Sequence, residues 1–166
     1  MPGDWDAATY DRIADPMFRW GLVVVGWLDL EGSERVLDAG CGSGRVTEVL
    51  AERLPRGQVV ALDASPAMLA QARRRLARFG DRVRYVLADL ARPLPIEEPV
   101  DAVLSTATFH WVPDHDALFG NLAAVLRPGG KLAAQCGAAG NIERVLQAAR
   151  EAGVAWQGPT YFPTPE

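Results

Sequence analysis

The sequence is poor in cysteine, in long apolar runs and in positive charge, and each shortage excludes a class of protein. Its two cysteines, Cys41 and Cys136, show neither a disulfide framework nor metal-ligand spacing, so small buried thiols are expected. The apolar run at 21–28 is far shorter than the roughly 18 residues that cross a bilayer. A net charge of −4 argues against a polyanionic partner such as nucleic acid. The first six residues hold no basic region and no apolar signal core, so a cytoplasmic protein is expected.

The composition is that of a chain that folds around an apolar core. Of its 166 residues, 49% are hydrophobic and 23% are charged, which is ordinary for a soluble globular domain. A chain of this length predicts a single domain. Composition alone therefore does not indicate the function, which has to be inferred from the sequence motifs.

Residues 36–47 hold the pattern around which the rest of the chain is organised. A short apolar run that contains Asp38 is followed by Gly40, Gly42 and Gly44, and then by apolar residues at helical spacing. This order predicts a strand, a glycine turn and a helix. Because glycine lacks a Cβ atom, another molecule can approach the main chain closely, and the helix begins with N–H groups directed at the turn. Ligands of open α/β sheets bind at this point, beyond the carboxyl end of the strand.

The spacing of the glycines discriminates between nucleotide ligands. A dinucleotide fingerprint, G-x-G-x-x-G, needs its third glycine at position 45, which is Arg45, whereas the third glycine here is Gly44. The D-x-G-x-G-x-G pattern resembles motif I of the class I S-adenosylmethionine (SAM)-dependent methyltransferases, where the turn lies against the methionine and ribose parts of SAM. The alternative is a loop that merely turns the chain. The resemblance implies SAM as cofactor and S-adenosylhomocysteine as product. It places the contacts of this stretch on Asp38, Ala39, Gly40, Cys41, Gly42 and Gly44.

A second acidic residue stands at the end of the next predicted strand, residues 58–63. Asp63 lies 19 residues after Gly44, and an acid about 20 residues past a glycine turn accepts from ribose hydroxyl groups. The alternative is an Asp that only starts a turn. The resemblance places the ribose-binding acid here too, with Ala64 and Met68 beside the adenine, although Met68 serves at least as well as core filler.

Two further strands are followed by candidate cofactor residues. Asp89 follows the predicted strand 83–88, and the resemblance implies that its carboxylate accepts from the exocyclic amine of adenine, while the N–H of Leu90 reaches a ring nitrogen. The alternative for Asp89 is a capping role in a loop. Thr106 follows the predicted strand 100–105, at the edge where the acceptor meets the methyl group.

Residues 106–112 indicate the class of acceptor. They lack the N/D-P-P-Y tetrapeptide of methyltransferases that act on amino groups of DNA and protein. They resemble the x-x-x-x-H/Q-W-V segment of the small-molecule group that contains trans-aconitate methyltransferase and the malonyl-carrier-protein methyltransferase. His110 is a candidate general base or hydrogen-bond partner of the acceptor, and the alternative is a ring that packs beside the cofactor. The resemblance suggests O-methylation of a small carboxylic acid.

The N-terminal segment, residues 4–30, is predicted to be helical and to be divided at Pro16. Its Y-D-x-x-A sequence at 10–14 resembles a stretch that precedes motif I in many of these methyltransferases, where its Tyr approaches the reacting end of the cofactor. Tyr10 is thus a second catalytic candidate, with packing on a surface helix as the alternative. Core contacts are expected from Phe18, Trp20, Val24 and Trp27.

The predicted fold is α/β, a Rossmann-like, doubly wound and mostly parallel sheet with helices on both faces. Further helices are predicted over 45–53, 66–79, 114–126 and 141–152, with a turn at 127–130 and a last strand over 131–136. We interpret the chain as one SAM-dependent methyltransferase domain, 1–166. It comprises an N-terminal helical lid, 1–30, a cofactor-binding core, 31–137, and a truncated C-terminal part, 138–166.

The family sheet has seven strands, and the sequence predicts five. The last two strands normally form a hairpin beside strand 5, so residues 131–136 are expected to be an exposed edge through which two copies associate, unless the chain is a fragment. Competing functions are a SAM-binding protein without turnover and an NAD-dependent oxidoreductase, which Arg45 disfavours. A nucleic-acid methyltransferase is a weaker reading, opposed by the net charge of −4.

Overall fold

The computed structural model describes residues 15–141 and 143–153. Five parallel strands form one sheet in the order β3-β2-β1-β4-β5. The strands are β1 (Arg35–Ala39), β2 (Gln58–Asp63), β3 (Val83–Leu87), β4 (Val100–Thr106) and β5 (Leu126–Gln135). The chain order reverses direction across the sheet between β1 and β4, which is the switch point where ligands bind in doubly wound folds. The predicted Rossmann-like α/β architecture is confirmed.

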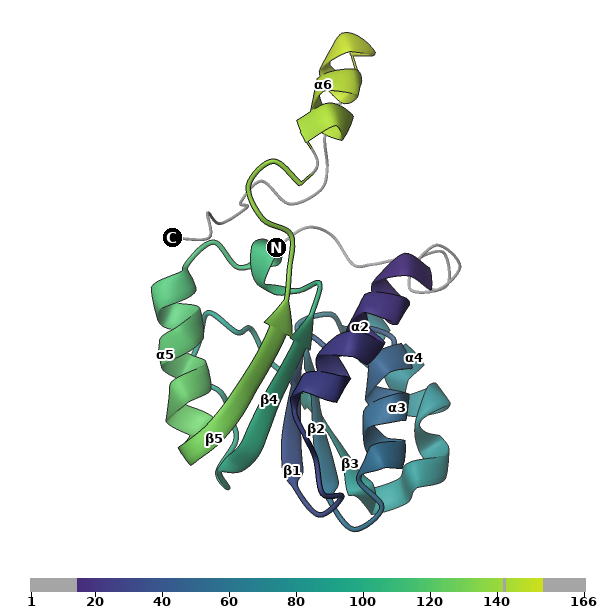
Figure 1. Ribbon diagram of the computed structural model, residues 1–166, viewed down its shortest axis with the longest axis vertical. Coiled ribbons are helices and arrows are strands. Elements are labelled where there is room, and N and C mark those ends of the chain that lie inside the picture. The colour runs from purple at the N-terminus through teal and green to yellow at the C-terminus, as the bar shows by residue number, and fades with distance from the viewer. Residues whose placement is uncertain (1–14, 142, 154–166) are drawn as a thin grey trace.

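Helices cover both faces of the sheet (Figure 1). One face packs against α2 (Asp15–Trp27), α3 (Arg45–Arg53) and α4 (Pro66–Arg75), and the other packs against α5 (His115–Val125). Each strand contributes apolar residues to both layers, so the sheet separates two apolar cores, as parallel sheets require. Two 3-10 helices, η1 (Ala77–Arg82) and η2 (Phe109–Trp111), follow α4 and β4.

The helices begin where the sequence supplies caps. Ser65 caps α4 by accepting from the N–H of Met68 over 3.2 Å, and Pro66 occupies the first helical position. Asp114 caps α5 in the same way, accepting from the N–H of Ala117 over 2.9 Å. These local signals fix where the two helices begin.

Two element boundaries differ from the prediction. The helix predicted over 66–79 ends as α4 at Arg75, because the chain tightens into η1, which contains Gly80 in the left-handed region at φ 55°. The strand predicted from 131 begins at Leu126, because Leu126 already pairs with Val100 before an irregularity restores pairing between Lys131 and Ala102. The predicted turn at 127–130 is thus absorbed into β5 as a bulge.

The expectation that the tryptophans of α2 are core residues is wrong. Trp20 is 54% exposed and Trp27 is 60% exposed, whereas Val24 is buried. On its other side α2 packs against α3: the Arg45 guanidinium lies over the Phe18 ring, 4.7 Å from its centroid. With Val23, the two tryptophans form a stripe at helical spacing on the side of α2 turned away from α3.

On the side of α2 that carries the tryptophan stripe, the sheet ends with β5. This strand pairs with β4 alone among the described residues. Leu132 of β5 is 42% exposed there. The helix α6 (Glu143–Glu151) stands away from the sheet (Figure 1) and leaves this edge open. The predicted exposed edge is present, and the tryptophan stripe is exposed because the described chain places no further element beside it. Among the described helices, none is long and apolar enough to cross a membrane.

Candidate cofactor and acceptor site

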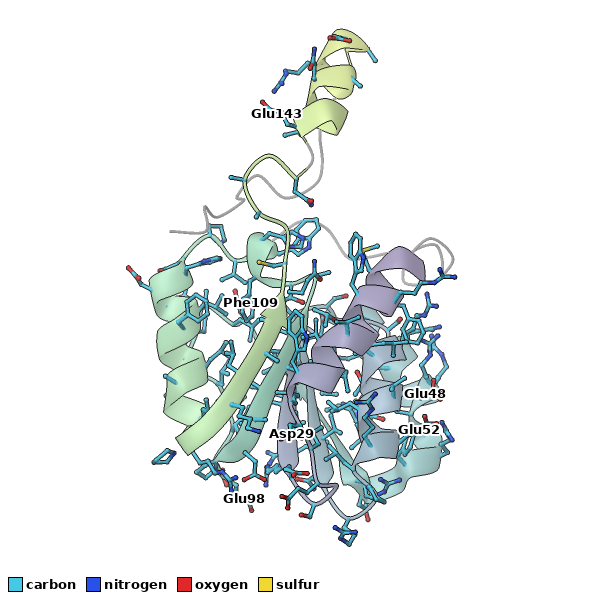
Figure 2. All side chains as sticks on the ribbon, in the orientation of Figure 1. Asp29, Glu48, Glu52, Glu98, Phe109 and Glu143 are labelled. Carbon is cyan, nitrogen blue, oxygen red and sulfur yellow. The ribbon has the colours of Figure 1, made fainter. Side chains whose placement is uncertain are left out.

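Nearly all of the predicted site residues gather at one end of the sheet. Asp38, Asp63 and Thr106 stand at or next to the carboxyl ends of β1, β2 and β4, and Asp89 follows β3 by two residues. Because all strands are parallel, these ends face the same side of the molecule. In Figure 2, Phe109 marks this end beside β4 and β5, and Glu98, which precedes β4, marks the opposite end.

The three glycines of the turn serve two different purposes. All adopt left-handed φ values, 87° at Gly40, 55° at Gly42 and 85° at Gly44, which other residues adopt only with strain. A Cβ at Gly40 would lie 2.2 Å from Oγ1 of Thr108, and one at Gly44 would lie 3.2 Å from the main chain of Ala72 in α4. A Cβ at Gly42 would meet nothing within 4 Å. Two glycines therefore allow close packing, and the middle one faces open space.

Asp38 is the most unusual ionisable group of the site. It is 1% exposed, Oδ2 accepts from the hydroxyl of Thr47 over 2.7 Å, and Oδ1 has no hydrogen-bond partner in the described part of the chain. Burial raises its pKa to about 7, opposed by the Thr47 hydrogen bond and reinforced by the nearby charge of Asp63. An orphaned buried carboxylate oxygen of this kind calls for a hydrogen-bond donor or a cation.

Asp63 is held by backbone N–H groups on both carboxylate oxygens. Gly42 donates to Oδ2 and Ser65 donates to Oδ1, each over 2.8 Å. Burial raises the pKa of this carboxyl, and the backbone hydrogen bonds oppose the rise by favouring the charged form. The carboxylate is thereby fixed between the glycine turn and the start of α4, and each oxygen keeps a lone pair for a further donor.

The residues expected around the adenine differ in burial and in hydrogen bonding. Met68 is buried in α4, as core filler would be, and Ala64 lies half-buried between Asp63 and the α4 cap. Asp89 accepts from the N–H of Ala91 over 2.9 Å, so it does cap a turn, and this bond occupies Oδ1. Leu90 is buried, and its carbonyl accepts from Asn121 of α5. Their contact with adenine stays a prediction.

The segment after β4 folds over the glycine turn. Thr106 accepts through its carbonyl from Oγ1 of Thr108 over 3.0 Å, and Thr108 fills the space above Gly40. Between them Ala107 has a left-handed φ of 54°, which costs a non-glycine residue about 1–2 kcal/mol. Its N–H donates to the carbonyl of Gln135 over 2.7 Å, so β5 holds the strained residue in place.

The structure describes only one of the two catalytic candidates, Tyr10 and His110. Tyr10 lies outside the described residues. His110 lies in η2, where its Nδ1 accepts from the backbone N–H of Gly137 over 3.1 Å. Burial lowers its pKa from the ordinary value. The structure therefore brings His110 to the carboxyl ends of β4 and β5.

Cys41 behaves as a small buried residue of the turn. It is 8% exposed, and its Sγ lies 3.6 Å from the carbonyl of Gly42, to which it donates. Burial raises the pKa of its thiol well above the ordinary range. Its N–H, like that of Gly40, donates to the carbonyl of Leu62, which anchors the turn to β2. The prediction of a buried thiol is confirmed for Cys41.

Sequence reasoning missed four residues that support the site. Thr47 contacts Asp38, the hydroxyl of Ser105 donates to the carbonyl of Ala39 over 2.7 Å, and Thr108 and Gly137 contact Gly40 and His110. One signal was present: Thr47 and Ser105 are polar residues at positions where the apolar pattern predicts burial. A buried hydroxyl needs a partner, and each of these finds one in motif I.

Comparison with known proteins identifies the family. Residues 36–130 match the model of a methyltransferase domain. The trans-aconitate 2-methyltransferase of Variovorax paradoxus (strain S110) is 42% identical over 132 residues, which make up 80% of this chain and 49% of that protein. The chain belongs to the class I SAM-dependent methyltransferases. Within them its similarity is to enzymes of the small-molecule type, and it spans about half the length of the curated relatives that it matches.

Solved structures agree with this assignment. A chain of the Haloferax volcanii complex between the Trm112 methyltransferase activator and a methyltransferase superposes with a TM-score of 0.73 at 23% identity, covering 89% of this chain and 63% of that one. A phosphoethanolamine N-methyltransferase 2 of Haemonchus contortus, solved with phosphomonomethylethanolamine and S-adenosylhomocysteine, superposes with a TM-score of 0.70 at 26% identity, covering 88% and 33%.

The residues present fit SAM. The cofactor carries a cationic ammonium group and two ribose hydroxyls, which are the donors that buried carboxylates require. Asp38 offers an orphaned oxygen, Asp63 offers lone pairs on a fixed carboxylate, and a Cβ at Gly42 would meet open space. The polar groups of these side chains therefore complement those of the cofactor.

Proposed function

We propose that this chain binds SAM at the carboxyl ends of β1, β2 and β3 and transfers its methyl group to a carboxylate oxygen of a small organic acid. The observation that carries the proposal is the pair of carboxylates around the glycine turn, of which Asp38 is buried and Asp63 is half-buried. Asp38 has an unpartnered Oδ1, and Asp63 is fixed by the N–H groups of Gly42 and Ser65. Support for the acceptor class comes from the 42% identity to a trans-aconitate 2-methyltransferase.

In this proposal the residues of the chain bind and orient. Asp38 pairs with the ammonium group of the methionine part, Asp63 accepts from the ribose hydroxyls, and Asp89 with Leu90 contacts the adenine. Thr106 and His110 line the edge at which the acceptor arrives. SAM supplies a methyl group activated by a positively charged sulfur. The protein contributes alignment of the acceptor oxygen with that group and exclusion of water.

The first test is thermal unfolding of the chain with and without S-adenosylhomocysteine. At 100 times its dissociation constant the ligand adds about 2.7 kcal/mol, which raises the unfolding temperature by several degrees in a domain of roughly this size. We expect the shift to vanish in Asp63→Ala and to persist in the matched control Asp81→Ala, because Asp81 is exposed in η1. A shift with NAD instead would mean that the glycine turn binds a dinucleotide.

The second test measures turnover. We expect transfer of labelled methyl from SAM to trans-aconitate or a related small acid, and release of the label by mild alkali, because a carboxylate methyl ester hydrolyses to methanol. An acid analogue with an amide in place of each carboxylate should accept nothing. Ligand binding without transfer to any acid would favour a SAM-binding protein without turnover.

Three further points remain proposals of the same kind. Residues 1–30 form a lid over the cofactor, and Tyr10 approaches the acceptor. Two copies associate through the edge of β5, which is supported by exposed Leu132 and by the stripe of Trp20 and Trp27 on α2. The enzyme acts in the cytoplasm, a reducing compartment that suits its free cysteines.

A further inference from the structure

Asp38 is enclosed by the fold with few hydrogen-bond donors for its charged form. Its backbone pairs with β2 on one side and β4 on the other, and Val36, two residues earlier, packs in the core under α2, α3 and α4. The Asp38 side chain lies on the same face of the sheet, because side chains alternate along a strand. Thr47 donates to Oδ2, and Oδ1 has no partner among the described residues. One donor is few for a carboxylate that has about four acceptor positions.

The groups beside Asp38 in the sheet and the turn do not compensate a negative charge. Its neighbours across the strands, Ala61 and Leu104, are apolar. Asp63, at the end of β2, is a second carboxyl group, and its charge raises the pKa of Asp38. Burial raises the pKa of the Cys41 thiol well above the ordinary range, so this group stays neutral. The nearby titratable groups are therefore either neutral or of the same sign.

The described charges of the helices on this face have other contacts or are exposed. In α3 the Arg45 guanidinium lies over the Phe18 ring, and Glu48 forms an ion pair with an arginine of η1. Arg19 of α2 is exposed. Within residues 15–141 and 143–153, neither carboxylate oxygen of Asp38 has a cation as partner. The ionised form of Asp38 thus lacks a counter-ion in the described chain.

A buried carboxyl group without a counter-ion is more stable in its neutral form. Burial accordingly raises the pKa of Asp38 to about 7. At pH 6 about nine in ten ligand-free molecules then carry the proton, whereas an ordinary aspartate is ionised. Because Thr47 donates to Oδ2, the proton belongs on Oδ1, the oxygen without a partner.

The cofactor would bring the charge that Asp38 lacks. SAM and S-adenosylhomocysteine each carry an ammonium group, which is fully protonated at pH 6 because α-amino groups titrate at about pH 8. A cation within about 6 Å of a carboxyl group favours the ionised form, so direct contact with Oδ1 is not required. The ionised carboxylate in turn binds a cation better than the neutral acid does. The proton and the ammonium group therefore compete for Asp38.

We propose that Asp38 exchanges a proton for the cofactor: it is protonated in the ligand-free chain and releases this proton to solvent when the ammonium group of the cofactor binds. The inference rests on the proposed function and deepens it, because it makes occupancy of the cofactor site depend on pH. One O–H bond of Asp38 breaks, and the proton passes to water or buffer. Thr47 is the positioning residue of this exchange, since its hydrogen bond holds Oδ2 and favours the ionised form.

Calorimetric titration with S-adenosylhomocysteine, in buffers of different ionisation enthalpy, counts the protons released. We expect about 0.9 proton per bound ligand at pH 6 and about 0.5 at pH 7, the fractions of Asp38 protonated before binding. Asp38→Asn should bind about 10- to 100-fold more weakly at pH 7 and release none. The matched control Asp81→Asn, exposed in η1, should behave as the wild type. Binding without proton release at pH 6 would overturn the inference and leave the proposed function standing.

A ligand without the ammonium group separates Asp38 from Asp63. 5′-Methylthioadenosine keeps the adenine and the ribose of the cofactor, so it engages the proposed ribose-binding carboxylate without supplying a cation. We expect it to bind at pH 6 with no release of protons. A release equal to that of S-adenosylhomocysteine would assign the proton to Asp63, which contradicts the exchange at Asp38.

Two variants of Thr47 test its positioning role. Thr47→Val keeps the shape and removes the hydroxyl, so the pKa of Asp38 should rise further. The number of protons released at pH 7 should then increase from about 0.5 to about 0.9. Thr47→Ser keeps a donor and should restore the wild-type number. A purely structural role would change affinity alone, so equal proton numbers in Thr47→Val and wild type would exclude Thr47 from the exchange.

A titration of the ligand-free chain tests the starting state. Carbon-13 NMR of protein labelled at the aspartate carboxyl carbons follows each group with pH, and Asp38→Asn identifies the signal of Asp38. We expect its midpoint at about pH 7. A midpoint near the ordinary value of 3.8 would overturn the exchange even if S-adenosylhomocysteine binds. Absence of binding at every pH would instead overturn the proposed function and the exchange together.

Discussion

Asp38 is buried at the end of β1, and the fold favours its protonated form over its ionised form. Its pKa in the folded chain is about 7, against an ordinary value of 3.8, so the folded chain holds the proton more tightly than the unfolded chain. The stabilisation from this group is complete below about pH 4 and is lost as the pH rises to 7. Ionisation of Asp38 is thus unfavourable in the folded chain until a cation reaches the carboxylate.

Replacing Asp38 by Asn should remove this dependence. Asn resembles the protonated acid and can still accept from Thr47, so the free energy of unfolding of Asp38→Asn should match the wild type near pH 4. At pH 7 it should exceed the wild type by roughly 3 kcal/mol. Urea unfolding at several pH values measures the difference. Parallel curves for the two proteins between pH 4 and 7 would show that Asp38 titrates normally.

Gly42 allows a test that separates conformational strain from loss of ligand space. Gly42 and Gly80 share a φ of 55°, and a Cβ at either would meet nothing within 4 Å. Gly42→Ala should therefore cost about 1–2 kcal/mol of stability through its positive φ. Gly80→Ala should cost more, because Gly80 has a ψ of −134°, which lies outside the regions open to residues with a Cβ. Only Gly42→Ala should weaken S-adenosylhomocysteine binding, by at least tenfold in calorimetry. Equal affinities in the two variants would place the ligand elsewhere.

At the scale of elements, the caps of α4 and α5 should contribute similar stability. Ser65→Ala and Asp114→Ala each remove one side-chain acceptor from a helix start, and each should lower the free energy of unfolding by about 1 kcal/mol. Ser65→Ala keeps the backbone N–H that holds Asp63, so that carboxylate should remain in place. Chemical unfolding of both variants and of the double variant checks additivity. A change near zero at Ser65 would show that Pro66 alone sets the start of α4.

The helices and strands were predictable where a local sequence pattern marks them. Apolar runs that end at Asp38 and Asp63 predicted β1 and β2, and the glycine turn predicted the start of α3 to the residue. The tryptophans of α2 were misplaced because helical periodicity reports an apolar side but not whether another element covers it. The bond to Asp38 was missed because a polar residue in an apolar pattern, Thr47, shows that a buried hydroxyl needs a partner but not which partner it has. The contact of Gly137 with His110 was missed because it forms only through tertiary folding, across 27 residues.

At the scale of the whole molecule, the edge of β5 is the surface expected to bring two copies together. Like strands paired antiparallel across a twofold axis would bury the same patch on both copies. We expect analytical ultracentrifugation to show a dimer that Leu132→Lys dissociates. The matched control is Leu87→Lys, because Leu87 is 58% exposed on β3 at the other edge of the sheet. A wild-type monomer at all concentrations, or equal effects of the two variants, would exclude this interface.

The bulge that opens β5 has a practical consequence for engineering. Residues between Leu126 and Lys131 add length without shifting the pairing that follows, and Gly129 sits there with a left-handed φ of 77° and open space around it. This bulge lies at the amino ends of the strands, at the opposite end of the sheet from Asp38 and His110. A peptide tag or a reporter domain inserted there should leave ligand binding intact, so the chain can be tethered to a surface with its site facing away.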